Sequence, residues 1–408
     1  MKHYRWHRFI FSVLRYTAGP VIKLVMGYSC KKKKAPDAPL LVISNHNTDL
    51  DPAFVALGFS GHMYFVASEH SLRMGFASKL LKFVFSPIAI NKTREDVSAI
   101  KEILRRLKSG ASVCLFGEGD RSFSGATGPV TLAAAKLART SGAELATFRI
   151  EGGYFTSPRW SKKNRKGKMT GSVVNRYSAA ELKAMTNEQL LEAIERDIFE
   201  DAYQRQRVQP TLYKGKDLAE NIETTLYLCP GCNEIGTIRS EGDGFGCGCG
   251  LAGTYTEAGT LEGVTPEGDT LPFSTMLDWD RWQVKKLEEI IDAAGDGPIC
   301  ADEDQQLFEV SAAVAKTSAG EGAMSIDRRA FHCAGSSFPL GDIIRIVVVG
   351  QMTLLFALKG GATYEVRSAV PRSALKYREI FRILTKGTVH GAPRLNSDSL
   401  EKSRSRPQ

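Results

Sequence analysis

The sequence predicts an α/β fold in which a mixed sheet flanked by helices is followed by a small cysteine-rich ribbon and a β-rich C-terminal module. Continuous apolar runs at residues 40–44 and 111–116 are typical of buried strands, and each runs into a polar or Gly-rich turn. Four cysteines lie between residues 229 and 249, and alternating runs separated by Gly and Ser follow from residue 307. Since the chain has 408 residues, two or three folded units are expected.

Composition and charge exclude several classes of protein. Hydrophobic residues make up 43% and charged residues 24% of the chain, which excludes a disordered, a collagen-like and a multispan membrane protein. Residues 1–40 hold nine Lys or Arg against one acid, and residues 159–168 hold six more with none, whereas the whole chain carries only +9. Such clusters favour anionic phosphate on lipid headgroups or nucleic acid, although a solvated loop explains the second cluster equally well.

The N-terminal segment is expected to lie in a membrane interface. Its apolar stretch is interrupted by Arg15 and Lys23, so that no uncharged run reaches the roughly 20 residues of a membrane span. No signal-peptide cleavage pattern follows, and we expect the chain to remain in the cytoplasm. Two short helices broken at Gly19-Pro20 would place aromatic residues in the acyl boundary and cations on anionic lipid. The alternative is that one stripe packs on the protein core: Ile10, Leu14 and Ala18.

The first apolar run, LLVIS at residues 40–44, ends in the polar sequence NHNTDLDP, which places His46 at the C-terminal end of a strand. A neutral imidazole there can take a proton from an attacking hydroxyl, provided that a carboxylate holds its other nitrogen. If a helix begins near Asn47, the carboxylate of Asp51 folds back beneath the ring. Asp49 is the competing carboxylate and a candidate N-terminal cap of the same helix.

A second motif, VCLFGEGDRSFSG at residues 113–125, continues another buried strand into a Gly-rich turn. Gly117 and Gly119 permit close approach of the backbone to a ligand. The guanidinium group of Arg121 offers a planar set of donors for phosphate. An ordinary loop with a salt bridge between Glu118 and Arg121 is the alternative.

In order and separation, NHNTDLD and FGEGDRS resemble the N-H-x4-D and F-P-E-G-T-R-S blocks of the glycerolipid acyltransferase family, the lysophosphatidic-acid acyltransferase-like enzymes. SPIAINKTR at residues 86–94 is similar to the family's intermediate block, and AELATFRIEGG at residues 143–153 is a looser match to the fourth. The resemblance covers residues 35–210 and implies an acyltransferase core. It implies His46 as the general base, Asp51 as its orienting partner, and a set of residues around the phosphate-bearing acceptor: Glu118, Gly119, Arg121, Lys92 and Arg94.

The sequence departs from the family pattern at three places. Gly117 stands where the family has Pro, Asp120 stands where it has Thr, and the fourth block lacks its usual Pro. A carboxylate beside a phosphate site is unfavourable to a dianion, which allows an acceptor other than plain lysophosphatidic acid.

The cysteine cluster is typical of a structural zinc site. C-P-G-C and C-G-C-G form two close pairs separated by the length of a hairpin, which lets four thiolates meet one tetrahedral Zn²⁺: Cys229, Cys232, Cys247 and Cys249. Two disulfides or free thiols are the alternative, and a reducing cytoplasm disfavours the disulfides. The segment around these cysteines is not basic, so binding of nucleic acid is not expected.

The resemblance implies a peripheral enzyme on the cytoplasmic face of a membrane. Such an enzyme moves a fatty acyl group from acyl-CoA or an acyl-carrier protein directly to the hydroxyl of 1-acyl-glycerol-3-phosphate or a related lysophospholipid, in phospholipid biosynthesis. No Ser or Cys nucleophile is required, and Cys114, which lies inside a strand, is expected to be buried. The alternatives are a non-catalytic lipid-binding regulatory protein and a zinc-ribbon nucleic-acid binder.

The remaining segments complete the expected organisation. Residues 155–222 are expected to form helices, including an amphipathic stretch at 187–207. The runs FEVSAAVAKT, GAMSIDRRAFHCAG, IIRIVVVG, TLLFALKG and ATYEVRS, followed by a helix at 374–386, resemble a pleckstrin-homology or GRAM-like module. The expected units are an interfacial segment at 1–34, an acyltransferase domain at 35–222, a zinc-ribbon-like segment at 223–258, a β-rich module at 259–388 and a disordered tail at 389–408.

Overall fold

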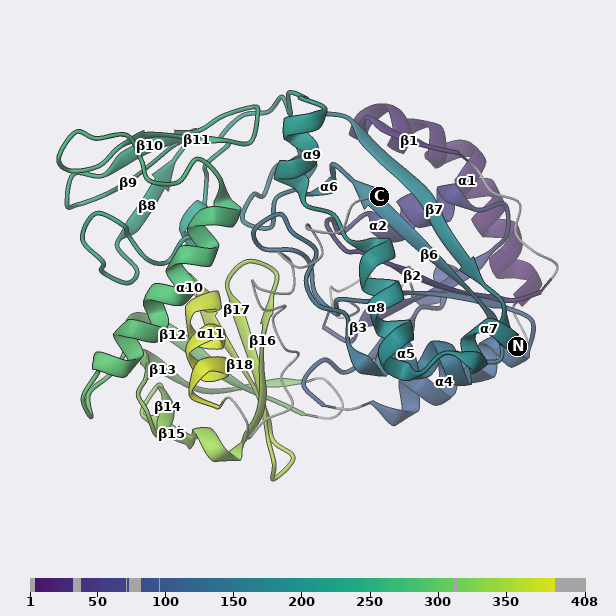
Figure 1. The fold of residues 1–408 in the computed structure, drawn as a ribbon. Helices are drawn as coiled ribbons and strands as arrows, with labels where there is room; N and C mark the ends of the chain where they lie inside the picture. The colour runs from purple at the N-terminus through teal and green to yellow at the C-terminus, as the bar shows by residue number, and fades with distance from the viewer. Residues whose placement is uncertain are drawn as a thin grey trace.

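The first half of the chain forms a seven-stranded sheet with the order β1-β7-β6-β2-β5-β3-β4 (Figure 1). The computed structural model describes residues 4–31, 38–70, 72, 82–94, 96–311 and 315–385. Strands β6, β2, β5, β3 and β4 run parallel, whereas β7 is antiparallel to β6 and pairs in parallel with β1. This confirms the expected mixed sheet. Its strands are β1 (Tyr28–Cys30), β2 (Leu40–Ser44), β3 (Met63–Ser68), β4 (Ile88–Ile90), β5 (Ser112–Phe116), β6 (Glu144–Glu151) and β7 (Met169–Tyr177).

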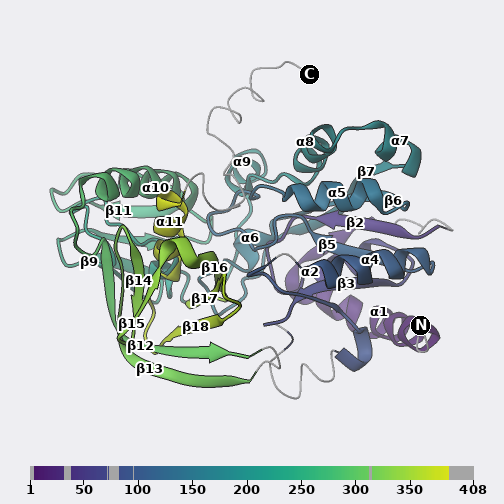
Figure 2. The same ribbon diagram turned by 90° about the horizontal axis from the view of Figure 1, so that it is seen from below.

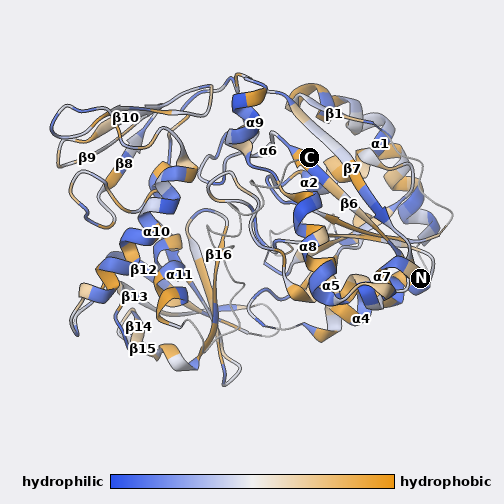
Figure 3. Ribbon diagram, in the orientation of Figure 1, coloured by the Kyte–Doolittle hydropathy of each residue, from blue (hydrophilic) through white to orange (hydrophobic). Residues whose placement is uncertain are grey.

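Helices cover both faces of this sheet, because its central strands are apolar on both sides. In β2, Leu40 and Val42 pack toward α1 and α2, and Leu41 and Ile43 pack toward α4, α5, α7 and α8. Figure 2 shows α7 and α8 above the sheet and α1 below it, and the side of α8 that faces the viewer in Figure 3 is hydrophilic. The helices are α1 (Tyr4–Met26), α2 (Asp51–Gly58), α4 (Val97–Lys108), α5 (Leu132–Thr140), α6 (Gly153–Thr156), α7 (Ala179–Ala184), α8 (Asn187–Ile198) and α9 (Ala202–Val208).

One expectation for residues 155–222 is wrong. The segment is not wholly helical, because residues 169–177 form β7, whose Thr170, Val173 and Val174 are β-branched and suit a strand. The amphipathic stretch at 187–207 is helical, as expected, but it is divided into two helices. It ends as α8 at Ile198 and begins again as α9, for which the side chain of Asp201 is the N-terminal cap.

Helix α1 is continuous, so the expected break at Gly19-Pro20 is wrong. Gly19 lies against α2, where a Cβ atom would come within 2.8 Å of Leu57. The guanidinium group of Arg15 donates to the carbonyl oxygens of Ala56 (3.0 Å) and Gly61 (2.9 Å) at the C-terminal end of α2. These tertiary contacts hold the helix across Pro20. The packed stripe therefore contains His7, Phe11 and Gly19, and not Ile10, Leu14 and Ala18 as the alternative had it.

A four-stranded antiparallel sheet follows, with β8 (Ile238–Glu241), β9 (Gly244–Cys247), β10 (Ala252–Tyr255) and β11 (Leu261–Val264). The next element, α10 (Met276–Ala293), was not expected from the sequence. Its N-terminal half packs with the ribbon and with α6 and α9, and its C-terminal half packs with the C-terminal module. Trp279 of α10 donates its indole N–H to the carbonyl oxygen of Leu228 at 2.9 Å. Helix α10 therefore joins all three parts of the chain.

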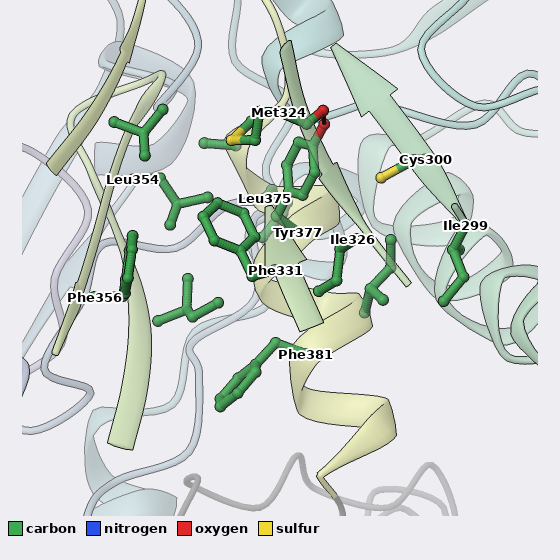
Figure 4. Packing of buried hydrophobic residues seen from close by; sticks show 14 of the residues in the cluster. Ile299, Cys300, Met324, Ile326, Phe331, Leu354, Phe356, Leu375, Tyr377 and Phe381 are labelled. Atoms are coloured by element: carbon green, nitrogen blue, oxygen red, sulfur yellow. Dashed lines mark hydrogen bonds between the residues drawn. The ribbon is translucent and has the colours of Figure 1, made fainter. Parts of the chain in front are cut away.

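The C-terminal module is a seven-stranded antiparallel sheet closed by one helix, which confirms the expected β-rich module. The strand order is β15-β14-β13-β12-β18-β17-β16. Side chains of α11, including Leu375, Tyr377 and Phe381, enter the core beside Phe331 and Phe356 (Figure 4). The elements are β12 (Cys300–Val310), β13 (Lys316–Ile326), β14 (Ala330–Cys333), β15 (Ser336–Pro339), β16 (Ile343–Val349), β17 (Thr353–Leu358), β18 (Thr363–Ser368) and α11 (Ala374–Leu384), and two short 3-10 turns are η2 (Ile222–Thr224) and η3 (Leu340–Asp342).

The strand boundaries in this module differ from the expected runs. FEVSAAVAKT is not one strand, because it contains the end of β12 and the start of β13, and β12 begins earlier, at Cys300. GAMSIDRRAFHCAG is divided between β13 and β14 by a turn at residues 327–329. Lys386, the expected end of the last helix, and the tail at 389–408 lie outside the described residues.

Candidate active site

His46 and Asp51 form a hydrogen-bonded pair at the C-terminal end of β2. The Nδ1 atom of His46 lies 2.8 Å from an Oδ atom of Asp51, which leaves Nε2 as the ring nitrogen that can accept a proton. The imidazole stacks on the ring of Phe116 at the end of β5, with 4.3 Å between ring centroids. The Asp51 side chain is fully buried, whereas that of His46 is 19% exposed. The histidine is therefore oriented from inside the protein and accessible from outside.

The position of Asp51 is fixed by the backbone before it. Its carboxylate accepts the N–H groups of Asn47 (2.6 Å) and Thr48 (3.0 Å) and the hydroxyl of Thr48 (2.7 Å). The expected helix start near Asn47 is wrong, because α2 begins at Asp51, with Pro52 in its first turn. Asp51 therefore reaches His46 across a turn that precedes α2, and not along a helix. Asp49 does not cap α2 and is instead the partner of Arg121.

Glu118 connects the second motif to the backbone of the first. One of its oxygens accepts the N–H of His46 and the other accepts the N–H of Gly128, each at 2.7 Å. Burial raises the pKa of Glu118 to about 8, although these two backbone N–H groups act to lower it. Since both oxygens are already engaged, direct binding of an acceptor by Glu118 would require one of these bonds to be exchanged. Its contacts indicate that it positions His46.

Arg121 lies beside the histidine loop. Its Nε atom donates to the carbonyl oxygen of Asn47 at 2.9 Å, and its terminal nitrogens donate to Asp49 (3.0 Å) and to the carbonyl oxygen of Ser157 (2.7 Å). It does not pair with Glu118, which was the alternative for this loop. Gly119 has a φ of +70°, a conformation that favours glycine, and no atom of the described residues lies within 4 Å of the position that a Cβ would take. The backbone is therefore open to a ligand at this residue.

The two basic residues of the intermediate motif are placed differently from each other. Lys92 lies 3.8 Å from the carboxylate of Asp120, next to the second motif. Arg94 donates to the backbone of Gly361 and to the hydroxyl of Thr363 in the C-terminal module. Lys92 is thus brought to the site, whereas Arg94 joins two modules.

Two residues that sequence reasoning missed hold the histidine loop in place. The side chain of Asn45 donates to and accepts from the backbone of Ile150 in β6, both at 2.8 Å. Glu200, in the break between α8 and α9, accepts from the side chain of Asn47 (3.0 Å) and from the N–H of Gly152 (2.7 Å). Burial raises the pKa of Glu200 to about 7. The sequence offered a signal for Asn45, because this residue precedes His46 in the motif. Glu200 lies far from both motifs in sequence, and its neighbours indicate no role at the site.

The basic segment at residues 159–168 is only partly a surface cluster. Arg159 and Arg165 are buried, and Arg165 lies over the ring of Tyr255 at 4.6 Å. Lys163 forms an ion pair with Asp217. This segment therefore offers fewer free cations to a polyanion than its composition indicates.

The four cysteines of the ribbon converge on one point. Their sulfur atoms all lie within 4.8 Å of one another, with Cys229 to Cys249 at 3.7 Å and Cys232 to Cys247 at 3.8 Å. A tetrahedral zinc site with Zn–S bonds of about 2.3 Å requires sulfur atoms about 3.8 Å apart. The cluster can therefore hold a metal ion, and its dimensions fit zinc.

Residues 28–151, which contain both motifs, match the family model described as Acyltransferase. None of the curated proteins compared with the chain matches it. One matching solved structure is the 1-acyl-sn-glycerophosphate (LPA) acyltransferase PlsC from Thermotoga maritima, which is 17% identical and has a TM-score of 0.40; the match covers 49% of this chain and 80% of that one. The domain at residues 28–151 belongs to the acyltransferase family, as the resemblance of its motifs predicted.

Proposed function

We propose that the protein is a membrane-surface O-acyltransferase of phospholipid biosynthesis. It moves a fatty acyl group from acyl-CoA or an acyl-carrier protein to the hydroxyl of 1-acyl-glycerol-3-phosphate or a related lysophospholipid. The observation that supports this most directly is the His46–Asp51 pair, which leaves Nε2 available at an exposed edge of the sheet inside an acyltransferase domain.

In the proposed reaction, Nε2 of His46 takes the proton of the acceptor hydroxyl as its oxygen attacks the thioester carbonyl carbon. Asp51 stabilises the imidazolium that forms. The C–S bond then breaks, an ester is left on the acceptor, and the departing thiolate receives the proton from His46. No covalent enzyme intermediate is formed. Cys114, which lies within the second motif, is fully buried in β5 and cannot attack a donor.

The experiment that tests this function uses the full chain on anionic vesicles. Radiolabelled acyl-CoA or acyl-carrier protein is supplied with lysophosphatidic acid or with other lysophospholipids. Labelled diacyl product is expected from the wild type. The absence of product with both donors and every acceptor would instead favour a non-catalytic lipid-binding protein.

The Asp51→Asn variant is expected to lower kcat by about 10³-fold. A carboxamide cannot hold the imidazolium as a carboxylate does, and it favours the wrong tautomer. Asp327 in the C-terminal module supplies a matched control, because it also accepts two backbone N–H groups and pairs with a histidine, His332, at 2.8 Å. Asp327→Asn should leave kcat unchanged in the same assay. A kcat of Asp51→Asn within tenfold of the wild type would contradict the role of Asp51.

We propose that α1 attaches the enzyme to an anionic membrane, on the cytoplasmic face. The helix is long and apolar enough to cross a membrane, and only 17% of its most apolar 18-residue stretch is buried against the protein. One face packs on the domain through His7 and Phe11, and Arg15 on the same face donates a hydrogen bond to the carbonyl oxygen of Ala56 in α2. Helix α1 lies at the periphery of the molecule (Figure 3). Its opposite face exposes the large apolar side chains of Trp6, Phe9, Val13, Tyr16 and Leu24. A helix packed in this way is suited to lie in the interface.

Replacing Leu24, which is 73% exposed, by glutamate should weaken binding to anionic vesicles by about tenfold or more. The change removes an apolar side chain from the acyl boundary and adds a like charge. Ser12→Glu, an equal change of charge at an exposed polar position of α1, should weaken binding by about fivefold at most. Cosedimentation with vesicles measures both, and equal losses in the two variants would contradict insertion of the apolar face.

We further propose that the four-cysteine cluster holds a structural Zn²⁺. All four candidate ligands are thiolates, which is typical of closed structural sites. The zinc would join the loop at Cys229 to the hairpin that carries Cys247 and Cys249, and the chemistry of the active site would not involve it.

A further inference from the structure

Three cationic side chains from different parts of the chain meet at the carboxylate of Asp120. Arg159 donates to it at 2.6 Å, Arg378 of α11 lies 3.5 Å away and Lys92 lies 3.8 Å away. These cations lower the pKa of Asp120 to about 2, against the effect of its burial, so the carboxylate is ionised. Arg378 and Arg382 also share the carboxylate of Glu379, at 2.8 and 2.9 Å, so this group of four cations and two carboxylates has an excess of two positive charges.

The cluster is held in place before any ligand binds. Arg159 is buried and donates to the carbonyl oxygens of Val348 (2.7 Å) and Gly350 (3.1 Å) in the C-terminal module. The guanidinium groups of Arg159 and Arg378 both lie over the ring of Phe123, at 3.7 and 4.5 Å from its centroid. By contrast, the side chains of Arg378, Asp120 and Lys92 are 24–30% exposed. The cluster is thus rigid on its inner side and open to solvent on its outer side.

The cluster adjoins the catalytic pair. Asp120 lies between two residues that bind the backbone of His46: Glu118 accepts its N–H, and the N–H of Ser122 donates to its carbonyl oxygen at 3.0 Å. In Figure 2, α11 and β16 lie on the side of the C-terminal module that faces α6 of the acyltransferase domain. The loop that binds the backbone of His46 therefore also carries the carboxylate that Arg378 approaches.

We propose that Lys92 and Arg378 bind the phosphate of the acceptor lipid and that the buried Arg159 holds Asp120 beside them, so that the C-terminal module completes the acceptor site. Asp120 lowers the net positive charge of the cluster and thereby weakens its preference for a dianionic phosphomonoester over a monoanionic phosphodiester. The site therefore accepts lysophospholipids with a phosphodiester headgroup as well as those with a phosphomonoester. This inference rests on the proposed acyl transfer and specifies the substrate class of that site.

Arg378→Gln should raise the KM for a phosphodiester lysophospholipid about tenfold, with kcat and the KM for the acyl donor nearly unchanged. Arg382→Gln is the matched control, since both arginines lie on α11, both donate to Glu379 (2.8 and 2.9 Å) and their exposures are 24% and 23%. Arg382 has no contact with Asp120 among the interactions of the described residues. A structural role of Arg378 would lower the melting temperature without changing the KM for the acceptor.

Asp120→Asn should shift the ratio of kcat/KM values for lysophosphatidic acid and for lysophosphatidylglycerol about tenfold toward lysophosphatidic acid. An unchanged ratio, or equal acceptor KM values in Arg378→Gln and Arg382→Gln, would overturn the inference while acyl transfer itself stands.

Binding of the soluble headgroups tests the site without catalysis. Glycerophosphoglycerol, a phosphodiester, should raise the melting temperature of the wild type and of Arg382→Gln, but not that of Arg378→Gln. This result in a protein that acylates no lipid would support the anion site while contradicting the proposed reaction. The same stabilisation of Arg378→Gln would overturn the site.

Discussion

Replacing His46 by alanine is expected to reduce kcat for acyl transfer by about 10³-fold or more, which is close to loss of activity. The variant loses the only group that the proposed reaction uses to take the proton of the acceptor hydroxyl. Stability should change little, because the imidazole is partly exposed and its main contacts are with Asp51 and Phe116. Initial rates with saturating donor and acceptor, together with thermal unfolding, measure both effects.

The chain contains a natural control for this experiment. His332 is also bonded to an aspartate five residues away, Asp327, at 2.8 Å, but it lies in the C-terminal module. His332→Ala should therefore retain the kcat of the wild type. If His46→Ala keeps a tenth or more of the activity while folded, another residue must act as the base, and the central assignment is wrong.

Replacing Cys229 by serine is expected to abolish stoichiometric zinc binding and to lower the melting temperature by about 10 °C. Cys229 is fully buried, and it belongs to the same core cluster as Trp160 and Tyr203 of the first half of the chain and Trp279 of α10. Loss of the metal would therefore loosen the packing between the ribbon and its neighbours. Metal analysis of the purified protein and a thermal unfolding curve provide the two measurements.

Cys30→Ser is the control, since Cys30 is a free cysteine outside the cluster. It should bind as much zinc as the wild type. Retention of one zinc per chain in Cys229→Ser would refute the four-cysteine site. A wild-type protein without zinc, whose Cys229→Ser variant is equally stable, would show that the cluster consists of free thiols.

The parts of the structure that depend on neighbouring residues could be predicted from the sequence. LLVIS is apolar at every position, and β2 is buried on both faces. The pair of His46 and Asp51 is local, so spacing was sufficient to bring the two side chains together. The start of α2 was misplaced, although Pro52 was a usable signal, because proline is favoured in the first turn of a helix.

The features that depend on distant contacts could not be predicted. The low helix propensity of Gly and Pro predicts a break at Gly19-Pro20. Packing of Gly19 on α2 and the hydrogen bond from Arg15 to Ala56 keep α1 continuous. Glu200 reaches Asn47 across 153 positions of sequence. Arg378 approaches Asp120 only because the C-terminal module folds against the loop after β5. The residue pattern within a short segment of sequence does not indicate such distant contacts.

Helix α2 connects the catalytic pair to the proposed membrane-binding helix α1. Its first residue is Asp51, which orients His46, and the carbonyl groups near its last turn are held by Arg15 of α1. Eight residues of helix span about 12 Å. With α1 lying in the lipid surface, the length of α2 would set the distance between the imidazole and the bilayer. A lysophospholipid could then be acylated after rising only part of the way out of its leaflet, and its product would sink back without crossing water.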